Sequence, residues 1–522
     1  MWLVSTFEKI YFKKIFFVST FLDWYNFRNV KRVLYRIIHY LECVLLGFSG
    51  IIILRIIKKY VMITMRGVVS MIFQRKIYDK LLQWKENSAD EKALMIEGAR
   101  RIGKSTIVEE FGKNEYKSYL LIDFNDVSQV VKDAFEKYLN DLDTFFMILS
   151  TEYNKTLYPH ESLIIFDEVQ QYPKARQSVK KLIKDGRYHY IETGSLISIK
   201  ENVKDITIPS EERKLRMFPL DFVEFCRALN EEKMVDYIET CFKQKKPLED
   251  DLHHKAMMIF KQYILVGGMP KAVLKYLENG RSFAAADEEK RDILTLYRND
   301  ISKAEVKYRS RIASIFDQIP AFLSQHEKRV KLSNIESNST FPMYQETFFW
   351  LGDSMITNEC FNCSDPNVGL SMNEDRTFVK CYMGDTGLLI SHAFSEPEIA
   401  DGELYKTILH DNLSINEGMI FENAIAQQLV SNGYPLFFYT RYNHEKHRND
   451  IEIDFLISNG SKLKPKIYPI EVKSGKRYTT KSLERFIEVF HNRIGAAYII
   501  HTKNLSKQNN VICIPAYMTF CL

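Results

Sequence analysis

The sequence predicts an α/β protein with at least two globular domains. Four short apolar segments, separated by stretches of helical periodicity, have the character of strands from one sheet: Lys92 to Ile96, Tyr119 to Phe124, Leu163 to Phe166, and "YHYIETGS" at 188–195. From about residue 416 the pattern becomes helix, strand, hairpin, strand, helix. Because strands that alternate with helices favour a parallel sheet covered by helices, we expect such a sheet in the first region.

Composition describes a globular protein of two to four domains, with 46% hydrophobic and 27% charged residues in a chain of 522. Residues 1–70 hold 11 Lys and Arg against 3 Asp and Glu, whereas the remaining residues hold 61 basic and 64 acidic side chains. Net charge of the main body therefore gives no support for a nucleic-acid partner, and only a local basic groove would suit one. Eight scattered cysteines without a secretory leader predict reduced thiols and a cytoplasmic location. The lone pair Cys360 and Cys363 favours buried thiols over a metal site.

The first domain-sized segment, residues 1–70, is basic, aromatic and apolar, with an uninterrupted apolar and small-residue run from Cys43 to Leu54. One interpretation is a membrane anchor or interfacial helix, which would make the protein membrane-associated. The other is a translated leader, with the natural start at Met62, Met65 or Met71. We favour the leader, because an ordinary amphipathic helix pattern begins abruptly after Met71.

A glycine-rich loop follows the first strand and fits the pattern G-x-x-x-x-G-K-[ST]. Its glycines allow backbone N–H groups to turn toward phosphate oxygens at a helix N-terminus. We expect ATP and Mg²⁺ as ligands, with Lys104 on the β- and γ-phosphates and Ser105 on the metal. The nucleotide-binding residues of this loop would be Gly98, Ala99, Arg100, Arg101, Ile102, Gly103, Lys104, Ser105 and Thr106.

Acidic and polar residues follow two later strands. Asp167 and Glu168 come directly after the strand that ends at Phe166, so that Asp167 would bind Mg²⁺ and Glu168 would act as general base. Ser195 or Thr193, at the end of another strand, would sense the γ-phosphate, or would form an ordinary strand-ending turn.

These motifs, followed by "EERKLRMFPLDFVEF", resemble a widespread family of prokaryotic AAA-type ATPases that carry a C-terminal domain of unknown function. The resemblance implies an ATPase domain over 71–235 and a homo-oligomer in which an arginine finger completes a neighbour's site. Arg213 and Arg216 are the finger candidates, although either could be an ordinary surface arginine.

The middle of the chain, 236–395, is expected to be a helical lid followed by a winged-helix-like region. Gly267 to Pro270, in the string "GGMP", should break a helix and form a fixed turn, as a nucleotide-sensing lid or as a structural hinge. This turn and the string Tyr297 to Lys303 also resemble the same ATPase family.

The last region, 396–522, presents a helical Glu422, a strand residue Asp454, and Glu471 and Lys473 on one face of a second strand. The first three would hold Mg²⁺, and Glu471 with Lys473 would serve catalysis of phosphodiester cleavage. Together they resemble the PD-(D/E)XK nuclease superfamily and its restriction-endonuclease-like fold. The proline that often precedes the aspartate is replaced by Ile453, and the glutamine frequent after the lysine is missing.

Two functions follow. One is an ATPase coupled to a nuclease-like domain that acts on nucleic acid, DNA before RNA. The other is a nucleotide-driven regulatory or binding protein whose nuclease-like domain is catalytically inactive.

Overall fold

The computed structural model describes residues 73–195, 210–325, 328–394, 417–445, 447–459, 466–475, 478–508 and 510–522. The segment 1–70 lies outside these residues, so both interpretations of it stay predictions. Within the described ranges, no helix has both the length and the apolar character that crossing a membrane requires.

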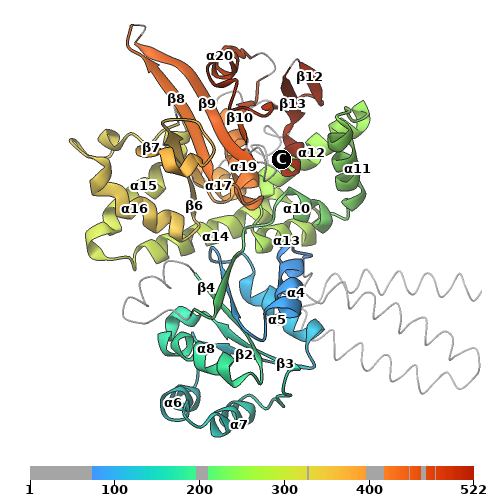
Figure 1. The fold of residues 1–522 in the computed structure, drawn as a ribbon, viewed down its shortest axis with the longest axis vertical. Coiled ribbons are helices and arrows are strands. Elements are labelled where there is room, and N and C mark those ends of the chain that lie inside the picture. Colours follow the sequence, from blue (N-terminus) through green and yellow to red (C-terminus); the bar gives the residue numbers. More distant parts are fainter. Residues whose placement is uncertain are drawn as a thin grey trace, which may run out of the picture. The chain divides into compact units, whose positions relative to one another are not determined.

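The first sheet has five parallel strands in the order β2-β3-β4-β1-β5 (Figure 1). The strands are β1 (Ala93–Glu97), β2 (Ser118–Asp123), β3 (Ser162–Asp167), β4 (His189–Gly194) and β5 (Glu212–Arg216). Four of them lie where the sequence predicted strands, and β5 was not predicted. The order places β4 between β1 and β3, so that the carboxyl ends of these three strands meet at one edge.

Helices cover both faces of this sheet. They are α4 (Ile77–Asn87), α5 (Lys104–Glu115), α6 (Gln129–Lys137), α7 (Leu142–Glu152) and α8 (Pro173–Asp185), with a short 3-10 turn η1 (Val169–Gln171). Alternate strand residues point to opposite faces. Leu94 and Ile96 therefore pack with α5, whereas Met95 belongs to a separate core with α6, α7 and α8.

The middle of the chain is helical, as predicted. It contains α10 (Phe222–Ala228), α11 (Glu232–Gln244), α12 (Asp250–Val266), α13 (Pro270–Glu278), α14 (Phe283–Ile301), α15 (Val306–Ser324), α16 (Phe341–Asp353) and α17 (Thr386–Ala393), with η2 (Leu332–Asn334) and η3 (Leu370–Asn373). The predicted break at Gly267 to Pro270 is confirmed, since α12 ends at Val266 and α13 begins at Pro270.

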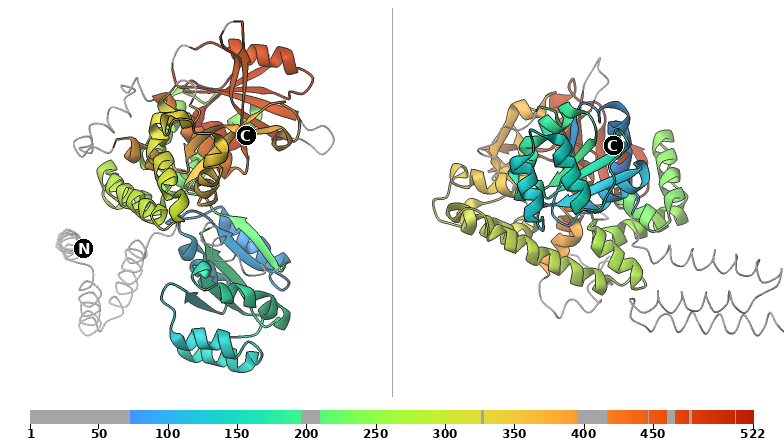
Figure 2. Two further views of the ribbon diagram at one scale, coloured as in Figure 1. Left: turned by 90° about the vertical axis from the view of Figure 1, so that its left-hand side faces the viewer. Right: turned by 90° about the horizontal axis from the view of Figure 1, so that it is seen from below.

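The second sheet has eight strands in the order β12-β13-β11-β10-β9-β8-β6-β7. They are β6 (Thr357–Cys363), β7 (Glu374–Met383), β8 (Leu436–Asn443), β9 (Arg448–Asn459), β10 (Lys466–Lys473), β11 (Ala497–His501), β12 (Ser506–Gln508) and β13 (Val511–Pro515). The long strands β8, β9 and β10 run side by side in orange (Figures 1 and 2). Helices α19 (Glu417–Ser431) and α20 (Lys481–Phe490) pack in different cores against this sheet, and η5 (Ala516–Cys521) closes the chain. The predicted order of helix, strand, hairpin, strand, helix is thus observed.

The winged-helix-like expectation is not confirmed. Helices α15 and α16 do precede the β6–β7 hairpin, but β6 pairs in parallel with β8 and the hairpin belongs to the eight-stranded sheet. This sheet therefore extends across the expected boundary at residue 395. Cys360 and Cys363, both on β6, are buried free thiols, as the sequence favoured.

Candidate functional site

The phosphate-binding loop runs from the end of β1 to the start of α5. The backbone geometry explains why both motif positions, Gly98 and Gly103, are glycine. Gly103, the N-cap of α5, has a φ of +91°, in the left-handed region that favours glycine. A Cβ on Gly98 would lie 2.6 Å from the carbonyl oxygen of Met217. The loop thus closes against Met217 and leads into the positive end of α5, which is a suitable place for a phosphate group.

Lys104 lies inside this loop and is almost fully buried, with 5% of its surface exposed. Its Nζ donates hydrogen bonds to the carbonyl oxygens of Gly98 and Ala99, each at 3.0 Å. Burial lowers the pKa of Lys104, and the nearby carboxylates of Glu168 and Asp167 act in the opposite direction. The ammonium is therefore held by the loop that would wrap the phosphates.

Ser105 and Asp167 meet at the carboxyl edge of the sheet. Ser105 Oγ donates to Asp167 Oδ1 at 2.8 Å, and Thr193 Oγ1 donates to the same oxygen. Burial raises the pKa of Asp167, while these two hydrogen bonds lower it. A serine hydroxyl and a carboxylate 2.8 Å apart are hard oxygen ligands of the kind that Mg²⁺ prefers, so the residues present fit the expected ion.

Glu168 follows with a strained backbone. Its φ of 53° and ψ of 46° are left-handed, which is uncommon for a residue with a side chain. Its backbone N–H donates to Thr193 Oγ1 at 3.4 Å, and Gln170 Nε2 donates to Glu168 Oε2. Thr193 therefore contacts both acidic residues, whereas Ser195 lies one residue beyond the end of β4 and is half-buried.

The other loop residues point outward or toward the helical region. Arg100 is exposed, and its Nη1 forms an ion pair with Asp300 Oδ1 on α14 at 2.7 Å. The carbonyl of Arg100 accepts a hydrogen bond from Tyr297 OH at 3.3 Å. Arg101 and Thr106 are exposed, and Ile102 is fully buried. Helix α14 thus contacts the loop through residues that sequence reasoning gave no role.

The two arginine-finger candidates lie on the edge strand β5, which pairs with β1. Both are exposed. Arg216 pairs with Glu97, the residue before the loop, whereas Arg213 pairs with Leu94, three positions further from it. Of the two, Arg216 is therefore nearer to the carboxyl edge of the sheet.

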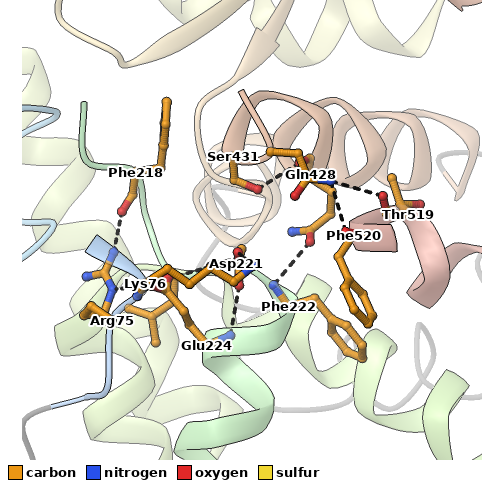
Figure 3. Close-up of polar contacts among 12 residues, drawn as sticks. Arg75, Lys76, Phe218, Asp221, Phe222, Glu224, Gln428, Ser431, Thr519 and Phe520 are labelled. Carbon is orange, nitrogen blue, oxygen red and sulfur yellow. Dashed lines mark hydrogen bonds and ion pairs between the residues drawn. The ribbon is translucent and has the colours of Figure 1, made fainter. Parts of the chain in front are cut away.

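Arg75, just before α4, was missed by the sequence analysis; it contacts the phosphate-binding loop, and Figure 3 shows its contact with Phe218. It is 7% exposed, and its Nη1 and Nη2 donate to the carbonyls of Ile102 at 3.0 Å and Phe218 at 2.6 Å. Its Nε lies 3.2 Å from Glu224 Oε1 on α10. A single arginine before a helix carries no recognisable pattern, so no sequence signal could have found it.

The string "FPLDFVEF" forms the start of α10, and part of it is drawn in Figure 3. Asp221 and Glu224 form a capping box at the start of α10, each accepting a backbone hydrogen bond from the other. The backbone N–H of Phe222 donates to Gln428 Oε1 on α19 at 3.3 Å (Figure 3). The string therefore connects the phosphate-binding loop to the helix that carries Glu422.

The three predicted carboxylates of the C-terminal region each form an ion pair with a lysine, and Lys473 is one of these lysines. Glu422 is paired with Lys328 and with Lys380, whose Nζ lies 3.4 Å from Glu422 Oε1. The same Nζ lies 3.8 Å from Asp454 Oδ1. Glu471 pairs with Lys473 at 3.0 Å.

The titration behaviour follows these pairings. Burial raises the pKa of Glu422, but the charges of Lys328 and Lys380 outweigh it and lower the pKa to about 2. Burial raises the pKa of Glu471 to about 7, with Lys473 acting in the opposite direction. For Asp454, burial and the charge of Glu422 together raise the pKa.

The metal set expected from Glu422, Asp454 and Glu471 stays a prediction. In the part of the chain that the structure describes, no group of three or more His, Cys, Asp or Glu side chains is placed to hold a metal ion. Lys380, at 1% exposure, forms ion pairs with two of these carboxylates. A lysine inside the apolar pattern "FVKCYM" was the available sequence signal, because a buried lysine needs an anionic partner.

Three family models match the chain, each over part of it. Residues 90–226 match the AAA domain, residues 257–398 match a domain of unknown function (DUF8612), and residues 417–518 match another (DUF4143). The first match covers the loop, the acidic pair and β5. The chain therefore contains an AAA-type P-loop ATPase domain, as the motifs predicted, while the restriction-endonuclease-like fold of the C-terminal region stays a prediction.

No curated protein matches the chain. Among solved structures, the S. cerevisiae Hsp104-ADP complex is 12% identical with a TM-score of 0.26, covering 69% of this chain and 44% of that one. Cdc6p from Pyrobaculum aerophilum is also 12% identical with a TM-score of 0.26, covering 66% of this chain and 97% of that one. The chain thus spans less than half the length of the Hsp104 chain that it matches.

Proposed function

We propose that the protein hydrolyses ATP at the P-loop. Lys104 would contact the β- and γ-phosphates, and the backbone of Gly98 to Gly103 would surround them. Ser105 and Asp167 would hold Mg²⁺, which would neutralise charge on the phosphates when it is bound. Glu168 accepts the proton of the attacking water. The observation that carries the proposal is the meeting of Ser105, Asp167 and Thr193 at one carboxylate oxygen.

The test compares two variants with matched controls. Lys104→Ala should abolish nucleotide binding, whereas Lys113→Ala, on the exposed surface of the same helix, should leave it intact. Glu168→Gln should bind ATP normally and hydrolyse it about 10²–10⁴-fold more slowly. Its control is Glu161→Gln, which removes an exposed carboxylate before β3. Undiminished hydrolysis in Glu168→Gln would exclude this residue as the base.

For the C-terminal domain we favour a contact role over nucleic-acid cleavage. In this role the domain binds a partner without cleaving it, and nucleotide at the P-loop controls the binding. The ion pairs of Glu422 and Asp454 with Lys380 support this choice, because they occupy the carboxylates that metal-dependent cleavage requires. Cleavage is the alternative, and DNA degradation in Mg²⁺ that is lost in Glu471→Ala and Lys473→Ala would establish it.

We propose nucleic acid as the partner of this domain, and we favour DNA over RNA. Steady-state ATPase rates with and without each polymer test the coupling directly. A rate that neither polymer changes would leave a protein partner as the better proposal. We also propose a homo-oligomer, because an exposed edge-strand arginine can reach a neighbour's site.

A further inference from the structure

Lys380 lies on β7 in a run of buried residues and is 1% exposed. Its Nζ faces the ring of Phe438 at 5.1 Å, and the carboxylates of Glu422 and Asp454 lie at 3.4 and 3.8 Å. Those carboxylates come from α19 and β9, so this one ammonium joins three elements of the domain.

Three carboxylates and three lysines form the ion pairs of this cluster. Its acidic members are Glu422, Asp454 and Glu471, and its basic members are Lys328, Lys380 and Lys473. Neutral donors also bind these carboxylates. Tyr382 OH donates to Glu422 Oε1, and the backbone N–H of Val472 donates to Asp454 Oδ2 at 2.8 Å.

A divalent cation at this place would have to displace the ammonium of Lys380, at a large cost in free energy. Hard cations bind where several carboxylate oxygens are free and their negative charge is uncompensated. Here the charge is already compensated by lysines on the chain, and like charges repel strongly where solvent is excluded. The site thus has the carboxylates of a metal centre and a lysine at its centre.

We propose that Lys380 takes the place of a divalent cation in the C-terminal domain and ties α19, β7 and β9 together. The carboxylates of Glu422 and Asp454 then act as structural anions. The proposal rests on the contact role proposed for this domain and is independent of ATP hydrolysis.

Thermal unfolding of the full, nucleotide-free chain with and without Mn²⁺ tests the proposal. Wild-type protein should show the same Tm in EDTA and in millimolar Mn²⁺. Lys380→Ala should lower the Tm by roughly 5–10 °C, because the buried Glu422 keeps only Lys328 and the half-buried Asp454 loses its lysine partner. Mn²⁺ should restore part of that loss, since a cation can now enter, and the added change Glu422→Gln should abolish the restoration.

Two further measurements decide the matter where folding is poor. The control Lys481→Ala, an exposed lysine at the start of α20, should show neither the loss nor the Mn²⁺ effect. Calorimetric titration of wild-type protein with Mn²⁺ needs no variant at the lysine. Binding that disappears in Asp454→Asn would overturn the proposal.

The outcomes separate this inference from the contact role. Mn²⁺ binding at this cluster without DNA cleavage would overturn the proposal for Lys380 and leave the contact role intact. DNA cleavage by a protein that binds no metal at this cluster would overturn the contact role and leave the proposal for Lys380 intact.

Discussion

Arg75 donates a hydrogen bond from Nη1 to the backbone carbonyl of Ile102 at 3.0 Å, across 27 positions of the chain. The same guanidinium reaches Phe218 and Glu224. One planar cation therefore joins the phosphate-binding loop, the segment before α10, and α10 itself. Arginine can make these three contacts at once, whereas lysine lacks the planar group with several donors.

Arg75→Ala is expected to destabilise the protein by about 3–5 kcal/mol, because Glu224 would remain buried without its cation. Nucleotide affinity should fall as well, since the loop carbonyl of Ile102 loses its donor. Urea unfolding and a fluorescent-nucleotide titration measure the two effects.

The control is the neighbouring residue. Lys76 pairs with Asp221 at 2.5 Å, with side-chain exposures of 40% and 4%, and Lys76→Ala should cost less, about 1–3 kcal/mol, because only one member of this pair is buried. Equal losses in the two variants would contradict the special position of Arg75.

Arg216→Ala is expected to lower kcat by roughly 10³-fold or more while nucleotide binding is kept, as for removal of an arginine finger. Arg213→Ala, three positions earlier on the same strand, is the control. Mixing Arg216→Ala with Glu168→Gln should recover activity, because each chain supplies what the other lacks. A mixture as inactive as its components would argue against a finger acting between subunits.

Gly268→Ala should destabilise the protein by about 1–3 kcal/mol or more through overpacking. A Cβ there would lie 2.1 Å from the carbonyl oxygen of Leu220, which is backbone and cannot move aside easily. Gly418→Ala on α19 meets nothing closer than Ser474 Oγ at 3.8 Å and should be neutral or slightly stabilising. Chemical denaturation of both variants provides the comparison.

Stability should rise with pH between about 8 and 10.5 through Lys290. Burial lowers the pKa of Lys290 to about 8 from 10.5, while Asp287 acts in the opposite direction. In that window the unfolded chain holds a proton that the folded chain has released, so raising the pH favours the folded state. This contribution is complete above the unfolded pKa and is lost as pH falls through about 8.

Unfolding free energies at pH 8, 9 and 10 measure the effect. The slope from this residue is at most about 1.4 kcal/mol per pH unit. Lys290→Met should remove it, and parallel curves for the two proteins would show that Lys290 does not titrate in this way.

Local patterns were predictable because their contacts join near neighbours or follow from parallel strands. The loop from Gly98 to Ser105 needs only its own residues and the start of α5. Ser105 and Asp167 are 62 positions apart, yet their meeting follows from strands whose carboxyl ends share an edge. Glu422 and Asp454 were grouped only by the resemblance to a nuclease superfamily, and both form ion pairs with Lys380.

What escaped prediction depends on register between distant elements. Lys328 lies 94 positions and Lys380 42 positions from Glu422. Their partnership is set by which strand lies beside which, and periodicity does not encode that choice. The winged-helix expectation failed to be confirmed for a related reason, since a hairpin after two helices looks the same whether it stands alone or extends a sheet.

The pairing of β6 with β8 has a practical consequence for dividing the gene. A fragment that starts at residue 396 would lack β6 and β7, and β8 would become a bare edge that invites aggregation. Such a fragment would also lose Lys380 and leave Glu422 without that partner. The two regions that match separate domains of unknown function are therefore one unit of expression and exchange, and a chimera should be joined upstream of α12.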